Sequence, residues 1–259
     1  MAFIGEYCIY DGISSEQFGL HIVNENGSME VNSGGEITIQ KSCMMGGLKY
    51  AYMGREAIDP CEIHMTLMRE KPMDAAEISA VMRWLGSVTY KELRIVQPDI
   101  STVKFNCIFT EISTVQHGND TYGVSVVGEC DSCFGEGNPI TVKVVGKSGS
   151  INLMNNGDYM DYVYPVVKIK MPTGGGRITI ANTSMYSRMF IFNDLAGSEQ
   201  LTVDCLRKTI KTSSSVRRLD NFNKNWLLLL PGMNNLSYLF STGEGEIEIQ
   251  CPCYRRIGN

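Results

Sequence analysis

The stretch that most constrains the fold runs from Lys71 to Val96, because it carries the only convincing helical pattern in a chain that otherwise alternates like strands. Asp74 can cap this helix together with Glu77, a capping box that satisfies N–H groups of the first turn. The apolar residues that recur at helical spacing, and so face a core, are Ala75, Ile78, Val81, Met82 and Leu85. Gly86 is expected to end the helix in a left-handed conformation. We expect this single short helix to pack against the sheets and not to form a cofactor-binding site.

The rest of the chain predicts β-structure. Tyr7 to Val23 is interpreted as a strand, an Asp-Gly turn and a second strand. Cys61 to Arg69 alternates between apolar and polar residues, and beyond Ile140 short strands recur at intervals of roughly ten residues, which is typical of a β-sandwich. Cys130 to Pro139 is rich in turn residues, so we place a domain boundary there. We therefore predict an N-terminal β domain over 1–135, with one helix at about 74–86, and a C-terminal β-sandwich over 136–259.

A long hairpin is predicted within the N-terminal domain, at about 32–58. Two alternating segments, Glu36 to Lys41 and Lys49 to Met53, flank a loop that contains two glycines. A projecting arm of this kind would suit a protein that embraces its neighbour in an assembly, and the alternative is a plain meander. The candidate contact residues are Ile37, Ile39, Tyr50 and Tyr52.

Composition excludes several classes of protein. A net charge of −5 and 20% charged residues describe an ordinary globular protein and argue against a dedicated nucleic-acid binder. The longest apolar run, Trp226 to Leu230, is far below the roughly 20 residues of a membrane span. The first residues lack the basic region and apolar core of a signal peptide, so we expect a protein that is made and kept in a cytoplasm.

The cysteines and histidines do not indicate a metal or catalytic site. Nine cysteines, an odd number, favour free thiols over a disulfide framework. Cys130-x-x-Cys133 and Cys251-x-Cys253 lack the spacing of a zinc site. The three histidines, His21, His64 and His117, fall in strands or a turn, without a visible nucleophile to serve. We predict no enzyme activity, no cofactor and no metal.

Two surface features remain open. The one basic cluster lies in and around a Ser/Thr-rich loop and consists of Arg207, Lys208, Lys211, Arg217, Arg218 and Lys224. Such a cluster is usually a solvated face, and the alternative is a docking surface for an acidic partner or a lumen wall past which DNA travels. Three tyrosines, Tyr159, Tyr162 and Tyr164, are candidates for a glycan-binding platform, although Tyr162 and Tyr164 could equally be packed strand residues.

Three segments, in order, resemble the distal tail protein family of long-tailed bacteriophages, also called the siphovirus tail component family. The first follows the N-terminal turn and contains Ser14, Ser15, Phe18, Gly19 and Leu20. The second follows the helix and contains Trp84, Leu85, Tyr90, Lys91, Leu93 and Ile95. The third contains Val203, Asp204, Trp226, Leu227, Leu229, Pro231, Gly232, Asn234, Leu236 and Tyr238. Physically, Pro231-Gly232 suits a type II turn, and Asn234 suits a turn residue that hydrogen-bonds nearby backbone.

The resemblance implies a mainly β protein. Its N-terminal domain would be a β-barrel-like or sandwich-like ring domain with a belt hairpin, and its C-terminal domain a galectin-like, jelly-roll sandwich. The implied function is structural: a hexameric ring at the distal tail tip of the virion that connects the tail tube protein to the tail-tip hub or tail-associated lysin. Receptor-binding proteins or host glycans would be further partners, and DNA would pass through the lumen without specific binding. The alternative is a carbohydrate-binding β-sandwich protein that recognises host cell-wall glycans.

Overall fold

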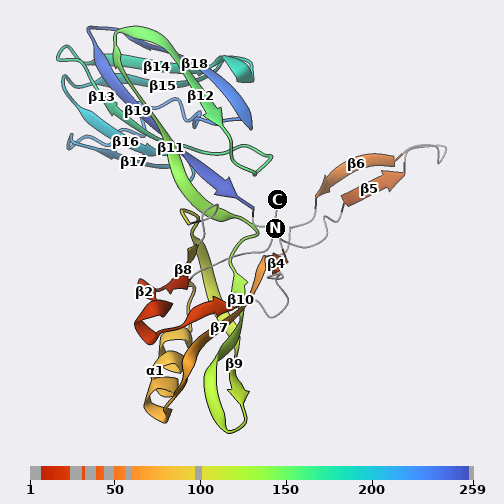
Figure 1. The fold of residues 1–259 in the computed structure, drawn as a ribbon. Helices are drawn as coiled ribbons and strands as arrows, with labels where there is room; N and C mark the ends of the chain where they lie inside the picture. The colour runs from red at the N-terminus through yellow and green to blue at the C-terminus, as the bar shows by residue number, and fades with distance from the viewer. Residues whose placement is uncertain are drawn as a thin grey trace. The chain divides into compact units, whose positions relative to one another are not determined.

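The computed structural model describes residues 7–23, 31–32, 39–43, 50–55, 60–96 and 101–256. Within these ranges the chain is mainly β with one α-helix (Figure 1), which confirms the predicted fold class. The chain divides into two compact units, one of Met1–Glu136 with Arg255–Asn259 and one of Gly137–Tyr254.

The N-terminal unit is built on one eight-stranded antiparallel sheet. Along the sheet the order is β2-β1-β8-β9-β10-β7-β3, and β4 also pairs with β7. The strands are β1 (Tyr7–Tyr10), β2 (Ile13–Ser14), β3 (His21–Val23), β4 (Val31–Asn32), β7 (Glu62–Met73), β8 (Lys91–Val96), β9 (Phe105–His117) and β10 (Asp120–Cys130). Asp11 and Gly12, which join β1 to β2, both have positive φ, at 51° and 79°. This is the backbone of a primed hairpin turn, as the Asp-Gly pair predicted.

Residues 15–18, which were expected to belong to a strand, instead form a short 3₁₀ helix, η1 (Ser15–Phe18). Ser14 caps it by accepting a hydrogen bond from the Glu16 N–H, and Gly19, with a φ of 68°, ends it. A serine cap followed by a left-handed glycine stops the extended chain and turns it back over the sheet. Gly19 is therefore a helix cap.

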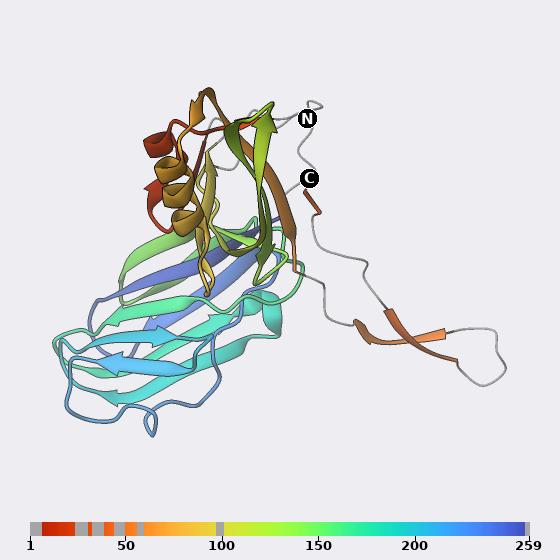
Figure 2. The same ribbon diagram turned by 90° about the horizontal axis from the view of Figure 1, so that it is seen from below.

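The helix α1 (Ala75–Leu85) follows β7 and lies beside the sheet (Figure 2). The predicted capping box is present, because Asp74 accepts from the Glu77 N–H and the Glu77 carboxylate accepts from the Asp74 N–H. The side chains that α1 buries are Val81, Trp84 and Leu85, with Ile78 and Met82 partly buried. The predicted stop was wrong in detail: Gly86 has a φ of −78°, and it is small because a Cβ there would lie 2.8 Å from the Met82 carbonyl oxygen.

The core of this unit lies between one face of the sheet and α1. On β7, Ile63, Met65 and Leu67 are buried while Glu62 and His64 are exposed, as the alternation predicted. Residues of β9 on the same side are also buried, and α1 closes the core from above. Burying such aliphatic and aromatic side chains stabilises the unit by roughly 1.5–3 kcal/mol for each side chain.

The hairpin strands β5 (Ile39–Cys43) and β6 (Tyr50–Arg55) form a separate two-stranded sheet. Cys43 is the partner of Tyr50, Lys41 of Tyr52 and Ile39 of Arg55, with a shift in register after Gln40. Two predicted strands of the hairpin are therefore paired with each other, and the rest of its predicted range lies outside the described residues, apart from residues 31–32.

The C-terminal unit is a sandwich of two antiparallel sheets. One has the order β11-β19-β13-β16-β17 and the other β12-β18-β14-β15. The first comprises β11 (Gly135–Gly146), β13 (Val166–Lys170), β16 (Gln200–Asp204), β17 (Thr209–Thr212) and β19 (Gly245–Arg255). The second comprises β12 (Ser148–Asn155), β14 (Gly176–Asn182), β15 (Arg188–Leu195) and β18 (Gly232–Phe240), with the 3₁₀ helix η2 (Thr183–Met185) between β14 and β15.

The segment that was expected to be a turn-rich linker is partly strand. β11 begins at Gly135 and includes Pro139, although proline cannot donate to a β-ladder. It is tolerated because β11 is the edge strand of its sheet, where one side of the backbone needs no partner.

Between the two sheets lies an aromatic and aliphatic core. Phe192 stacks on Phe222 with ring centroids 4.6 Å apart, and Phe190 contacts both rings. On β19, Ile247 and Ile249 are fully buried while Glu246 and Glu248 face outward, as the alternation predicted.

Candidate functional site

Carboxylates line the outer face of the N-terminal sheet. Glu62 on β7 and Glu129 on β10 are direct partners across the two strands, and both are exposed. Glu111 lies in the next row, where Val127 of β10 separates it from His64. His64 is 3.7 Å from Glu62 and offsets its charge only when protonated. Like charges directly opposite each other destabilise a sheet. The same negative charges would also repel a polyanion that approached this face.

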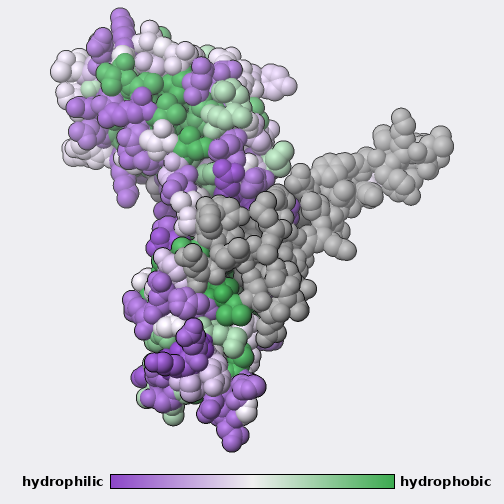
Figure 3. Space-filling model, in the orientation of Figure 1, coloured by the Kyte–Doolittle hydropathy of each residue, from purple (hydrophilic) through white to green (hydrophobic). Residues whose placement is uncertain are grey.

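Two cations of this unit, Arg94 and Lys104, form ion pairs. Arg94 and Lys104 contact the same carboxylate, Glu92, at 3.1 Å and 3.0 Å. Figure 3 shows hydrophilic residues interspersed with hydrophobic ones on the visible side of this unit. Among the described residues, neither Glu129 nor Glu111 forms an ion pair, so this face carries negative charge at both positions.

A hollow of about 500 Å³ lies where β7 meets α1, and Arg69 is one of the residues that line it. The Arg69 guanidinium donates to the carbonyl oxygens of Lys71 and Pro72, both at 2.8 Å, to that of Phe18 at 3.4 Å, and to both carboxylate oxygens of Glu77. All five of its N–H donors are thus used. The hydrogen bond from Arg69 also lowers the pKa of Glu77. Arg69 therefore joins the strand, η1 and the helix, and has no donor left for an anionic ligand.

The hairpin residues proposed as interface contacts are only partly placed. Ile39 lies on β5, and Tyr50 and Tyr52 lie on β6. Ile37 lies outside the described residues, and so do the side-chain positions of the other three. Their role in contacts between subunits stays a prediction.

Trp84 is the centre of the family-motif residues in the N-terminal unit. Its ring stacks on Phe18 at 5.0 Å, and its indole Nε1 donates to the Tyr10 carbonyl oxygen at 3.0 Å. Leu85 and Leu93 are fully buried beside it. Tyr90 differs, because it is 46% exposed. These motif residues hold η1, α1 and β1 together and are structural.

Asn234 organises the motif in the C-terminal unit. It is fully buried, and its side chain accepts from the Leu230 N–H at 2.8 Å and donates to the carbonyl oxygens of Leu230 and Gly232 at 2.8 Å and 3.1 Å. Gly232 has a φ of 82°, the value expected after proline in a type II turn, here Pro231-Gly232. The φ of Gly232 and the hydrogen bonds of Asn234 to nearby backbone agree with the predicted local roles of these two residues.

Asp204 closes the turn between β16 and β17. Its carboxylate accepts from the Arg207 N–H at 2.9 Å, and Lys208 in the same turn has a φ of 54°. The exposed members of the basic cluster are Arg207, Lys208, Lys211, Arg217 and Lys224. They surround the turn and the loop that follows β17.

Arg218 does not belong to that surface, which corrects its assignment to a docking cluster. It is buried and pairs with Glu199, also buried, through Nε at 2.8 Å and Nη2 at 2.7 Å. Burial alone would raise the pKa of Glu199, but hydrogen bonds from Arg218, Thr212 and the Ala196 N–H outweigh it and lower the pKa. A buried arginine must be paired, and Arg218 is paired with Glu199 of its own chain. It therefore fixes the loop and is not part of an exposed docking surface.

The three tyrosines do not share an exposed platform. Tyr162 is 45% exposed, whereas Tyr159 and Tyr164 pack against the sandwich core. Tyr159 also meets Tyr254 edge to face, with centroids 5.9 Å apart. Only Tyr162 therefore presents its ring to solvent as a glycan-stacking residue requires.

A groove of about 290 Å³ crosses the outer face of the five-stranded sheet. Lys168 and Glu248, which pair at 2.9 Å, lie along it together with Lys170, Gln200 and Glu246. The hydrogen bond from Lys168 lowers the pKa of Glu248, so the carboxylate stays ionised. The lining can hydrogen-bond a polyol but offers no aromatic ring.

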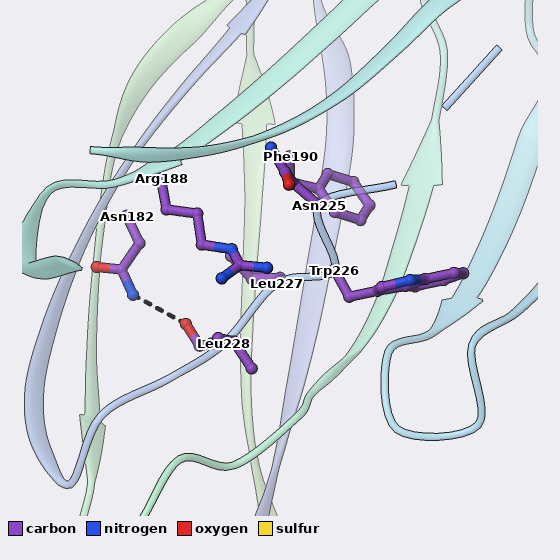
Figure 4. A pocket seen from close by; sticks show the side chains of 7 residues that line it. All are labelled: Asn182, Arg188, Phe190, Asn225, Trp226, Leu227 and Leu228. Atoms are coloured by element: carbon purple, nitrogen blue, oxygen red, sulfur yellow. Dashed lines mark hydrogen bonds between the residues drawn. The ribbon is translucent and has the colours of Figure 1, made fainter. Parts of the chain in front are cut away.

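At one end of the sandwich, a smaller space is enclosed by two segments (Figure 4). The Arg188 side chain extends over Leu227, beside the Trp226 indole, and Asn182 donates to the Leu228 carbonyl oxygen at 2.9 Å. No water-sized space remains between them. Arg188 therefore covers the end of the core with its aliphatic stem, and the space is not a ligand site.

Within the described ranges, no group of three or more His, Cys, Asp or Glu side chains is arranged to hold a metal ion. The eight cysteines outside the hairpin are buried free thiols. Burial raises the pKa of Cys8, Cys205 and Cys251 to about 12. Thiols held protonated in this way are poor nucleophiles and poor metal ligands. In the part of the chain with assigned structure, no helix has the length and apolar character to cross a membrane.

Two family models match the chain. One, described as a phage tail protein N-terminal domain, matches residues 3–132, and the other, described as a phage tail C-terminal domain, matches residues 133–251. A curated relative, the SPbeta prophage-derived uncharacterized protein YomH of Bacillus subtilis (strain 168), is 24% identical over 256 residues, which are 97% of this chain and 95% of the relative.

Solved structures share the fold. The SPP1 Dit protein, described as a paradigm of the hub adsorption apparatus in phages that infect Gram-positive bacteria, matches with a TM-score of 0.68 at 12% identity, over 95% of this chain and 98% of its own. A chain of the phage P2 baseplate in its activated conformation with Ca matches with a TM-score of 0.46 at 9% identity, over 93% and 97% of the two chains.

Proposed function

This chain belongs to a family of phage tail proteins and has the fold of the SPP1 Dit protein, and we propose that it is a distal tail protein, which forms a hexameric ring between the tail tube and the tail-tip hub. The observation that carries the proposal is the match to SPP1 Dit over nearly the whole of both chains, across two units of different architecture. A match over one sandwich alone would be compatible with many functions.

The negative charge on the outer face of the N-terminal sheet favours this face as the wall of the lumen through which DNA moves. Glu62, Glu111 and Glu129 would repel phosphate, and the cations Arg94 and Lys104 are occupied by Glu92. A wall that bound phosphate would slow the passage of DNA, since each lysine or arginine contact to phosphate adds affinity. In this proposal the acidic face takes the place of the basic cluster as the lumen wall.

The exposed basic residues of the C-terminal unit suit a docking role. Arg207, Lys208, Lys211, Arg217 and Lys224 are all exposed, and the cluster would attract an acidic surface on a receptor-binding protein or hub protein. Charge reversal at Lys208 and Lys211 is then expected to slow association with the partner and to weaken its salt dependence. Charge reversal at Arg177, an exposed residue of β14 in the other sheet, is the matched control.

The ring is tested by the mass of the purified protein in solution. Light scattering is expected to give six times the 28.8 kDa of one chain, and negative-stain images at the same concentration should show six-fold particles with a central hole. Particles of another symmetry, or a stable dimer, would contradict the hexamer.

A carbohydrate-binding role is a second proposal, favoured by one observation, the polar groove on the five-stranded sheet with Lys170, Gln200 and Glu246 in its lining. Titration of cell-wall glycan into the protein should then saturate, and Gln200→Ala should weaken binding while Tyr162→Ala tests the exposed ring. A titration without saturation removes this proposal and leaves the ring unaffected.

A further inference from the structure

Three cysteines of the N-terminal unit lie in one row across three neighbouring strands of its sheet. Cys107 of β9 is the direct partner of Cys130 of β10. On the other side of β10, the Cys130 N–H donates to the carbonyl oxygen of Cys61, the residue that precedes β7, at 3.0 Å. Each of the three side chains is 1% exposed or less, and all three belong to the same core. We call Cys61, Cys107 and Cys130 the cysteine row.

The sulfur atoms of the cysteine row are in contact. The Cys130 thiol is hydrogen-bonded to the thiols of both Cys107 and Cys61. Gly128, two residues before Cys130, makes room for one of them, since a Cβ at this glycine would lie 2.4 Å from the Cys107 Sγ. The Cys107 sulfur therefore lies over β10, on the face to which Cys130 projects.

The backbone brings Cys107 and Cys130 to the separation that a disulfide requires. In the neighbouring pair, the Asp131 N–H donates to the Asn106 carbonyl oxygen at 3.0 Å. Hydrogen-bonded and non-hydrogen-bonded pairs alternate along an antiparallel ladder, so Cys107 and Cys130 form a non-hydrogen-bonded pair, with Cα atoms about 4.5 Å apart. A disulfide spans roughly 4.4–6.8 Å between Cα atoms. Cys61 and Cys130 are joined by a backbone hydrogen bond instead, and the side chains of such pairs are farther apart.

Hydrogen bonding and burial keep these thiols protonated. The hydrogen bond with Cys107, together with burial, raises the pKa of the Cys130 thiol above its ordinary value. The hydrogen bond with Cys130, together with burial, raises the pKa of Cys61 as well. Because the thiolate is the form that reacts, the cysteine row is oxidised slowly in the folded protein, and an oxidant has to be small to reach it.

We propose that Cys107 and Cys130 are a site of reversible oxidation, at which a small hydroperoxide converts the two thiols into a disulfide between β9 and β10. Both cysteines belong to one chain, so the site does not depend on the ring. A tail protein is made in a reducing cytoplasm and then carried out of the cell, and the disulfide would form after that release. This timing alone rests on the proposed function.

The reaction balances with hydrogen peroxide as the oxidant. The Cys130 thiol loses its proton, its sulfur attacks one peroxide oxygen and the O–O bond breaks, which leaves a sulfenic acid on Cys130 and releases a first water. The Cys107 sulfur then attacks the Cys130 sulfur, so that the S–S bond forms and the S–O bond breaks, and the hydroxyl leaves with the Cys107 proton as a second water. Two thiols are oxidised, and one peroxide is reduced to two waters.

Mass spectrometry of the full chain tests the site. Cys43, whose side chain lies outside the described residues, is replaced by serine in every variant, so that the remaining thiols are the eight buried ones. The reduced protein is treated with hydrogen peroxide, and the thiols that survive are alkylated in guanidinium. A protease that cleaves before aspartate places Cys61, Cys107, Cys130 and Cys133 in separate peptides, 59–73, 99–119, 120–130 and 131–157.

The expected result is two alkylated thiols fewer than in the untreated protein, with peptides 99–119 and 120–130 joined and both thiols recovered by dithiothreitol. Cys61→Ala should keep this link, and the matched variant Cys107→Ala should lose it. An unchanged thiol count, a link from Cys130 to Cys61 or Cys133, or a loss that dithiothreitol does not reverse overturns the inference. The ring is judged separately, since light scattering of the reduced protein gives its mass whether or not the disulfide forms.

A second measurement shows whether the link fits the native sheet. Closing the loop from Cys107 to Cys130 restricts the unfolded chain and should lower the equilibrium constant for unfolding of this unit by roughly a hundredfold. Urea unfolding is followed by tryptophan fluorescence in a Trp226→Phe variant, in which Trp84 is the remaining tryptophan. A midpoint that moves to higher urea on oxidation supports the proposal, and an equal or lower midpoint overturns it.

Discussion

Replacing Arg218 by methionine should destabilise the C-terminal unit far more than any change to its exposed neighbours. The substitution keeps much of the side-chain volume but leaves the Glu199 carboxylate buried without its counter-ion. Glu199 accepts from Arg218 twice, from Thr212 and from the Ala196 N–H. Methionine removes two of these bonds, and the Thr212 and Ala196 bonds remain.

The size of the effect follows from these contacts. A hydrogen bond to a charged group contributes roughly 1.5–3 kcal/mol, so two of them give about 3–6 kcal/mol. Breaking a buried ion pair from one side typically costs about 3–5 kcal/mol. We therefore expect Arg218→Met to lower the free energy of unfolding by about 4 kcal/mol. Arg217→Met, at an exposed position, should change it by less than about 0.5 kcal/mol.

Urea unfolding followed by tryptophan fluorescence measures the difference, since Trp226 lies in this unit. The double variant Arg218→Met with Glu199→Leu should recover part of the loss, because it leaves no buried charge. If Arg218→Met costs no more than Arg217→Met, or if the double variant equals the sum of the single losses, the reasoning is refuted.

The same pair predicts a pH dependence. In the folded protein the pKa of Glu199 lies below its ordinary value of 4.5, so its contribution is present above that value and is lost as the pH falls through the folded pKa. Without Arg218, burial raises the pKa of Glu199 instead. The stability difference between the native protein and Arg218→Met should therefore narrow as the pH falls from neutral towards 5. A difference that widens would contradict this sign.

Three further predictions concern single sites. Asn234→Ala should lower the free energy of unfolding by about 2–3 kcal/mol, since it leaves the Leu230 and Gly232 backbone groups without their buried partner. Asn235→Ala, at an exposed position, is the control in the same denaturation measurement. Trp84→Phe should destabilise the N-terminal unit by about 1–2 kcal/mol through loss of the hydrogen bond to Tyr10, and an unchanged midpoint in urea would contradict that. The eight buried cysteines should react slowly with a thiol reagent in the folded protein and all nine rapidly in guanidinium, and rapid reaction of more than one before unfolding would show that their burial is incorrect.

Features that depend on neighbours along the chain could be predicted from the sequence. The capping box of α1, the Asp11-Gly12 turn and the role of Asn234 each involve residues within four positions of one another. The backbone groups that these side chains satisfy are local, so the sequence contains both partners.

Features that depend on register between distant segments could not be predicted. Arg217 and Arg218 are adjacent and chemically alike, yet only Arg218 is buried, because its partner Glu199 lies 19 residues earlier, immediately before β16. The opposition of Glu62 and Glu129 arises only once β7 and β10 pair. Arg69 likewise meets Glu77 across the junction of a strand and a helix. In each case two residues meet only in the folded structure, and the spacing of residues in the sequence does not predict the contact.

The candidate sites followed the same division. The sequence identified the hairpin strands from their alternation, but it did not show that β8 pairs with only three residues of β9. The structure does not bring the three tyrosines together as an exposed platform, because Tyr159 and Tyr164 pack against the core. They lie in an irregular segment, where strand alternation does not predict which side chains face the solvent.

The most direct test of the central claim is electron microscopy of virions of the phage that encodes this chain, labelled with gold-conjugated antibody against the purified protein. The proposal predicts label at the distal end of the tail and nowhere else on the particle. Label along the tail shaft or on the head, or particles without any label, would contradict a distal tail protein.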